Sequence, residues 1–177
     1  MPGSYSEAVI KAEKTSARPW AATAPKSILI PIDFSVASKH AVKHALGLAG
    51  AAARIILLHV IAPSAESRRD VVSLTEAAKK GLQSVIRSAA RGGDRSIRSL
   101  VRSGTPFQEI LAAAKENHVG LIVLAVHDSA PFGGLALGHT VERVSRYAPC
   151  PILLVREEEG NQASAKSPGA TANSSRL

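Results

Sequence analysis

The sequence feature that most constrains the fold is a set of short, nearly continuous runs of β-branched residues and leucine. Three such runs lie at residues 27–32, 54–60 and 119–125. A strand with one face in water alternates apolar and polar residues, whereas an unbroken apolar run is typical of a strand covered on both faces of a parallel sheet. These three runs are therefore predicted to be the central strands of such a sheet.

Two further segments are predicted to be strands at the edges of this sheet. Residues 95–102 are more polar than the three central runs and alternate less cleanly. Residues 151–155 begin with Pro151, which lacks the N–H group that a central strand has to donate. Both segments therefore suit positions with only one neighbouring strand.

The segments between the runs have the apolar period of helices. Helices are expected after Ser35, over 70–91, from Pro106 onward and over about 138–147, ending before Pro149. Strands and helices thus alternate along the chain, which predicts right-handed crossovers into a parallel sheet. The expected fold is a single α/β domain with a five-stranded parallel sheet and helices on both faces.

Two of these helices have recognisable start signals. Ser35 is expected to cap the first helix, because its hydroxyl can accept a hydrogen bond from a free backbone N–H. At the third helix, Thr105 is the expected cap, Pro106 suits the first helical position and Gln108 would complete a capping box.

Both ends of the chain are predicted to lie outside the domain. Residues 1–26 contain two prolines near their end and are expected to be a flexible arm. Residues 158–177 are rich in Ser, Ala, Gly and Asn and are expected to be disordered, because they cannot bury enough apolar surface to offset the entropy of ordering. The domain itself is predicted to span 27–157.

Composition limits where the protein works. No apolar stretch approaches the roughly 18 residues that a membrane span needs, so a transmembrane protein is excluded and no membrane partner is expected. The single cysteine cannot form an internal disulfide, and the N-terminus lacks the layout of a secretory signal. A cytoplasmic location is expected.

The formal charge of +8 raises the question of a nucleic-acid partner. The excess is shared between both ends of the chain and the middle. The densest basic set has no aromatic residues interleaved for base stacking, and we interpret it as a solvated face; its members are Arg87, Arg91, Arg95, Arg98 and Arg102. No nucleic-acid partner is expected.

Several side chains with reactive groups are interpreted as structural. His40 and His44 are four residues apart, but no third metal ligand accompanies them, so no metal site is expected. Residues 127–129 have the letters of a hydrolase triad, yet sequence neighbours cannot line up as nucleophile, base and orienting group, and no G-x-S-x-G motif is present. Cys150 has no basic neighbour close in sequence and is expected to be a packed thiol. The protein is therefore not expected to be an enzyme.

Polar residues follow the predicted strands at one edge of the sheet. In open parallel sheets, ligands bind outside the carboxyl ends of the strands, where helix N-termini also point. Asp33 follows the first strand, His59 and Val60 end the second, and the loop 126–137 after the fourth leads into the next helix. These segments are expected to form one crevice.

The sequence resembles the universal stress protein family over nearly all of residues 27–156. Five pieces in the family's order carry the resemblance: ILIPIDFS at 28–35, ILLHVIAP at 56–63, SGTPFQEILAAAKEN at 103–117, GLIVLA at 120–125 and LGHTVERVSRYAPCPILLV at 137–155. The resemblance implies a Rossmann-like (adenine nucleotide alpha hydrolase-like) sheet of order 3-2-1-4-5. It also implies a homodimer paired through the last strand, and a nucleotide site.

The family's nucleotide motif, G-x2-G-x9-G followed by Ser or Thr, is only partly matched. Ala125 and Asp128 stand at the first two glycine positions, Gly138 at the third, and His139 and Thr140 follow it. Motif glycines let backbone N–H groups approach phosphate oxygens, and a carboxylate at the same place repels them. ATP is therefore expected to bind weakly or not at all, with magnesium present only if ATP binds.

The resemblance assigns roles to two further residues. Asp33 matches the acidic residue that contacts the nucleoside, and Val60 matches the position whose backbone meets the adenine. Each has a structural alternative: Asp33 is a suitable helix-start residue, and Val60 suits simple core packing. For Gly138 the alternative is that a helix start needs a small residue.

These observations predict a stress-response factor with a degenerate adenine-nucleotide site. The alternative is an ATP-binding regulatory switch, in which nucleotide occupancy controls dimer formation or partner binding. A slow nucleotide hydrolase is a third reading, but the sequence offers no positioned general base or lysine clamp for it.

Overall fold

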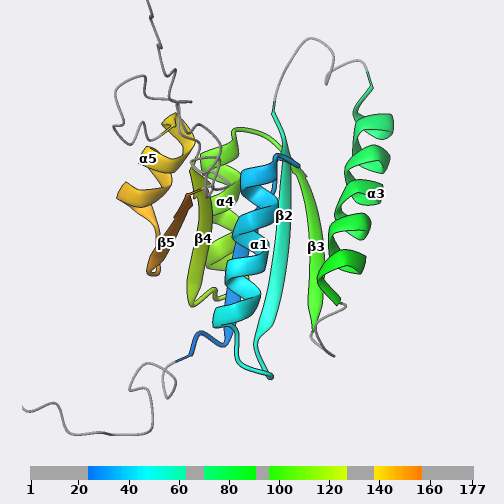
Figure 1. Ribbon diagram of the computed structural model, residues 1–177. Helices are drawn as coiled ribbons and strands as arrows, with labels where there is room; N and C mark the ends of the chain where they lie inside the picture. Colours follow the sequence, from blue (N-terminus) through cyan, green and yellow to red (C-terminus); the bar gives the residue numbers. More distant parts are fainter. Residues whose placement is uncertain (1–23, 63–69, 91–95, 127–137, 157–177) are drawn as a thin grey trace, which may run out of the picture.

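A five-stranded parallel sheet forms the centre of the computed structural model, which describes residues 24–62, 70–90, 96–126 and 138–156 (Figure 1). The strand order β3-β2-β1-β4-β5 confirms the predicted order. The strands are β1 (Ser27–Pro31), β2 (Arg54–Ile61), β3 (Ile97–Ser103), β4 (Leu121–Val126) and β5 (Ile152–Arg156).

Helices cover both faces of the sheet, as predicted. On one face lie α1 (Val36–Leu48) and α3 (Val71–Ala90), and on the other lie α4 (Pro106–Glu116) and α5 (His139–Tyr147) (Figure 1). None of the helices in the described ranges is long and apolar enough to cross a membrane.

Two-sided burial explains the continuous apolar runs of the central strands. In β1, Ile28 and Ile30 pack in the core cluster beneath α1 and α3, whereas Leu29 packs in the cluster beneath α4 and α5. All three side chains are completely buried. Side chains alternate between the two faces of a strand, so a strand covered on both faces has apolar residues at every position. The prediction of β1, β2 and β4 as central strands is confirmed.

The two weaker segments are the edge strands, as predicted, with small shifts in their bounds. Pro151 precedes β5, and its carbonyl accepts a hydrogen bond from Ile122 N at 3.0 Å.

The central run at 119–125 begins two residues before β4. Val119 N donates to Ala114 O at the end of α4, and Gly120 N donates to Ser27 O. These two bonds form the connection from α4 into the strand.

The helix-start predictions were half right. Ser35 caps α1, and its Oγ accepts a hydrogen bond from Ser38 N at 3.1 Å. Thr105 is the cap residue of α4 with Pro106 next to it, but the predicted capping box is wrong, because the Thr105 side chain makes no capping bond. In such a box, the backbone N–H of Gln108 donates to the Thr105 side chain. Here it donates to the Thr105 carbonyl, at 3.0 Å.

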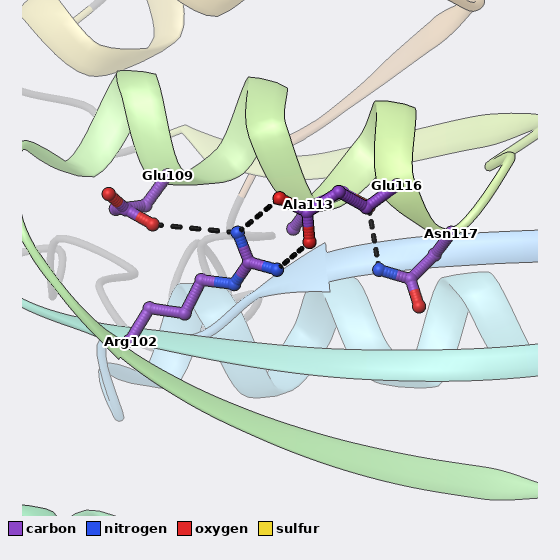
Figure 2. Close-up of polar contacts among 5 residues, drawn as sticks. All are labelled: Arg102, Glu109, Ala113, Glu116 and Asn117. Atoms are coloured by element: carbon purple, nitrogen blue, oxygen red, sulfur yellow. Dashed lines mark hydrogen bonds and ion pairs between the residues drawn. The ribbon is translucent and has the colours of Figure 1, made fainter.

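Arg102 ties the edge strand β3 to helix α4 (Figure 2). Its guanidinium lies between Glu109 and Glu116, which are two turns apart on α4. Nη1 is 3.5 Å from Glu109 Oε2, and both terminal nitrogens donate to the Glu116 carboxylate. The hydrogen bonds from Arg102 lower the pKa of Glu116 below its usual value.

The interpretation of the basic set as a solvated face is therefore wrong for one member. The Arg102 side chain is only 22% exposed, because two carboxylates of α4 face it. Arg87 and Arg98 are exposed, whereas residues 91 and 95 lie outside the described ranges. The predicted arm and tail also lie almost entirely outside these ranges, and their flexibility stays a prediction.

The ion pair predicts a pH-dependent contribution to stability. The pKa of Glu116 is lower in the folded protein than in the unfolded chain, where a glutamate carboxyl has a pKa of about 4.3. The ionised carboxylate therefore stabilises the fold above that pH, and Glu116→Gln should lower the melting temperature near pH 7. That contribution disappears as the pH falls through the folded-state pKa, so the two melting temperatures should converge toward about pH 2.

Glu76→Gln is the matched control for this experiment. Glu76 pairs with Lys79 at 2.8 Å within α3, so the pair connects no separate elements and its loss should have a smaller effect. Thermal melts followed by circular dichroism give the comparison. A difference between wild type and Glu116→Gln that does not change with pH would contradict the assignment.

Candidate functional site

A cavity of about 360 Å³ opens at the carboxyl edge of the sheet, where sequence reasoning had placed the crevice. It contains six of the predicted site residues, contributed by the ends of three strands and the start of α5: Asp33, Val60, Ala125, Gly138, His139 and Thr140. Asp128 lies outside the described residues.

The cavity walls are mainly apolar, with a few polar side chains. Ile32, Leu58, Ile110 and Leu124 are among the apolar residues that line it. Among the described lining residues there is an acid and two histidines, but no lysine or arginine. A concave apolar site with a few convergent polar groups is typical of small-molecule binding.

Asp33 has a structural role at the start of α1. Its Oδ1 accepts hydrogen bonds from Ser35 N at 3.0 Å and from Ser35 Oγ at 2.5 Å. Ser35 is the cap residue, so Asp33 supports the cap from two residues earlier and is not itself the cap. The same side chain is exposed and lines the cavity, so its capping role leaves it accessible from the cavity.

His59 lines the cavity in a fixed orientation. Its Nδ1 lies 2.7 Å from the carbonyl oxygen of Ile32. A carbonyl only accepts hydrogen bonds, so Nδ1 is the donor, and in the neutral ring Nε2 is then an acceptor. The His59 ring also packs against Phe34, with ring centroids 4.6 Å apart.

Sequence reasoning placed His59 in the crevice without assigning it a role, and it missed Ser38. Ser38 is 1% exposed, lines the cavity and donates from Oγ to Ser35 O at 3.1 Å. The position of His59 near the end of a buried strand indicated that it would line the crevice. Ser38 had no such signal, because a serine in the first turn of a helix is common.

Gly138 is the cap residue of α5, and nothing in the described structure requires glycine there. Its φ of −59° and ψ of 152° suit any residue. A Cβ at this position would meet no described atom within 4 Å. Within the described residues, the structural alternative for Gly138 therefore finds no supporting contact.

Comparison with known proteins identifies the family. The Universal stress protein family matches residues 25–156. The chain belongs to this family. Universal stress protein MJ0531 of Methanocaldococcus jannaschii is 30% identical over 141 residues, which cover 75% of this chain and 82% of that protein.

Two solved structures are similar to this universal stress protein in fold. The structure of hypothetical protein MJ0577 has a TM-score of 0.62 and 27% identity, and the match covers 76% of this chain and 97% of that one. A universal stress protein in complex with cAMP has a TM-score of 0.58 and 25% identity, with 75% and 97% covered.

The described positions of the family motif line the cavity in this universal stress protein, whereas Asp128 lies outside the described residues. Ala125, at the first glycine position, is half-buried in β4 and lines the cavity together with Gly138 and, from α5, Thr140. Val60 lines the cavity and packs against the core beneath α4 and α5, so its core packing is confirmed and its contact with adenine stays a prediction.

His40, His44 and Cys150 do not line this cavity. In the described ranges, no three His, Cys, Asp or Glu side chains are close enough together to hold a metal ion. Cys150 packs against the core beneath α4 and α5, as expected of a packed thiol, and burial raises its pKa. A raised pKa leaves little of the reactive thiolate near neutral pH.

The contacts of Asp33 predict that two substitutions differ in stability. Asp33→Ala should lower the free energy of unfolding by about 1 kcal/mol, because the Ser35 N–H and O–H lose their acceptor. Asp33→Asn keeps an acceptor oxygen and should cost less. Urea denaturation measures both changes, and an unchanged stability of Asp33→Ala would show that the capping contact contributes nothing.

Proposed function

We propose that this universal stress protein is a stress-response factor whose edge cavity is a weakened adenine-nucleotide site. The observation that carries the proposal is the single cavity lined by Asp33, Val60, Gly138 and Thr140, the residues that match the family's nucleotide positions. The similar universal stress protein in complex with cAMP supports an adenine nucleotide as the ligand.

The proposed roles follow the geometry of the cavity. Asp33 is exposed beside the place for a ribose, and its carboxylate can accept hydrogen bonds from sugar hydroxyls. Apolar walls from β1, β2 and β4 suit a flat base. Gly138 begins α5, whose first amides have no partner within the helix and can bind a phosphate.

The weakness of the site follows from its charge. Among the described lining residues no lysine or arginine is present to neutralise phosphates. Ala125 and Asp128 replace two motif glycines, and a carboxylate at the second position repels phosphate oxygens. ATP carries more negative charge than a monophosphate, so ATP is the adenine nucleotide that this site should disfavour most.

Restoring the motif should strengthen ATP binding. Ala125→Gly combined with Asp128→Gly opens the backbone and removes the carboxylate, and we expect a gain of roughly 1–3 kcal/mol in binding free energy. Isothermal calorimetry with ATP, with and without magnesium, measures the gain. Adding Asp33→Ala should then remove it, in a protein first verified as folded.

Asp128→Asn alone is the matched control, because it removes the charge and keeps the side chain. Tight ATP binding by the unaltered protein would overturn the proposal of a weakened site. Tight binding that disappears on chelation would assign Asp128 to magnesium. No gain in the double variant would show that the missing glycines are not what limits the site.

We also propose that the protein is a homodimer paired through β5. This strand lies at the end of the sheet, and its residues Ile152, Leu153 and Leu154 are half-buried in the single chain. An apolar edge strand is an aggregation hazard, which a symmetric second copy would cover.

The proposed role is non-enzymatic and cytoplasmic, as expected from the sequence.

A proline in β5 should test the dimer. Ile122 N donates to Pro151 O, so alternate residues of β5, including Leu153, bond to β4, and the backbone of Leu154 faces the open edge. Leu154→Pro should therefore yield a folded monomer, while Leu154→Ala, which keeps the N–H, should stay dimeric. Light scattering measures the mass, and circular dichroism verifies folding. A monomeric wild type at micromolar concentration would contradict the proposal.

A further inference from the structure

The turn between β1 and α1, which carries Asp33, has an unusual backbone. Phe34 has a φ of +67°, in the left-handed region that residues with a side chain rarely adopt. Such a conformation persists only where the surrounding structure holds it in place. The contacts of Phe34 therefore indicate what fixes this turn.

The Phe34 ring occupies the space above Gly81 in the middle of α3. A Cβ built on Gly81 would lie 2.7 Å from Phe34 Cε1 and 2.9 Å from Phe34 Cζ. Glycine in a helix interior destabilises the helix relative to alanine. The space that the Phe34 ring needs explains why a glycine stands at position 81. Gly47 in α1 provides the contrast, because a Cβ there would meet nothing within 4 Å.

His59 holds the turn from the other side. Its Nδ1 donates to the carbonyl of Ile32, and its ring packs against Phe34 at 4.6 Å between centroids. Ile32 and Phe34 are the two neighbours of Asp33 in sequence. His59 therefore contacts both neighbours of Asp33: the carbonyl of Ile32 through a hydrogen bond and the side chain of Phe34 through ring packing.

We propose that Phe34, seated between Gly81 and His59, positions Asp33 in the cavity and makes nucleotide affinity depend on helix α3. This inference rests on the proposed function, in which Asp33 contacts the nucleoside. A methyl group at position 81 would displace the ring. The turn could then relax from its left-handed φ, and the Asp33 carboxylate would move with the backbone. Phe34, His59 and Gly81 are positioning residues in this arrangement.

Gly81→Ala is the test, with two measurements on the full-length protein. Calorimetry with cAMP should show affinity reduced by about tenfold, since small displacements of a binding group are costly. Hydrogen exchange by NMR should show faster exchange of the Ser35 amide, which donates to Asp33 Oδ1. Gly47→Ala is the matched control, and it should change neither the affinity nor the Ser35 exchange rate.

Phe34→Leu provides a second variant that does not crowd the core. Leucine lacks the ring atoms that approach position 81, so Phe34→Leu alone should also weaken cAMP binding and speed Ser35 exchange. Once the ring is gone, the alanine no longer displaces it, so the double variant should match Phe34→Leu alone. Effects that simply add would mean that Gly81 acts independently of Phe34, and would overturn the proposal.

The two measurements separate this inference from the proposed function. If neither wild type nor variants bind cAMP, but Ser35 exchange follows the expected pattern, the positioning role stands and the proposed function fails for cAMP. If Gly81→Ala behaves like Gly47→Ala in both measurements, the positioning role is wrong. Weaker cAMP binding with unchanged Ser35 exchange would also overturn it, because Asp33 would not have moved.

Discussion

The burial of the central strands on both faces is the constraint on which the rest of this structure depends. Because helices cover β1, β2 and β4 on both sides, their interior positions are apolar, and polar chemistry is confined to the strand ends. Parallel strands place their carboxyl ends at one edge, beside helix N-termini. Asp33, His59 and Thr140 meet there because the sheet order sets β1 between β2 and β4.

The same constraint explains why residues at the cavity can differ from the family motif without loss of the fold. Ala125 replaces a motif glycine near the end of β4, where it lines the cavity, packs against the core beneath α1 and α3, and stays paired with Val155 of β5. Gly138 survives at a position where neither backbone angle nor packing within the described structure requires it. Residues at this edge are therefore less constrained by the core than the buried strand interiors are.

Local signals and tertiary contacts contributed differently to the helix starts and the surface. Ser35 capped α1 as expected, because a cap depends on residues three apart in sequence. The predicted capping box at Thr105 does not form, because the backbone N–H of Gln108 donates to the Thr105 carbonyl and not to the Thr105 side chain. Arg102 looked like one of a row of solvated arginines, yet Glu109 and Glu116 face it from a helix that only the fold brings alongside.

The sequence by itself determined the α/β class, the order of strands and helices, the edge and central strands, and the edge of the sheet where the cavity opens. These depend on apolar period, on turn residues and on chain order, all of which are local or follow from the handedness of crossovers. Only the tertiary structure decided that His59 orients the carbonyl of Ile32, that Ser38 lines the cavity, and that Phe34 needs a glycine at position 81. Phe34 and Gly81 are far apart in the chain, and no periodicity links them. Their relation exists only once α3 packs against the sheet beside the β1–α1 turn.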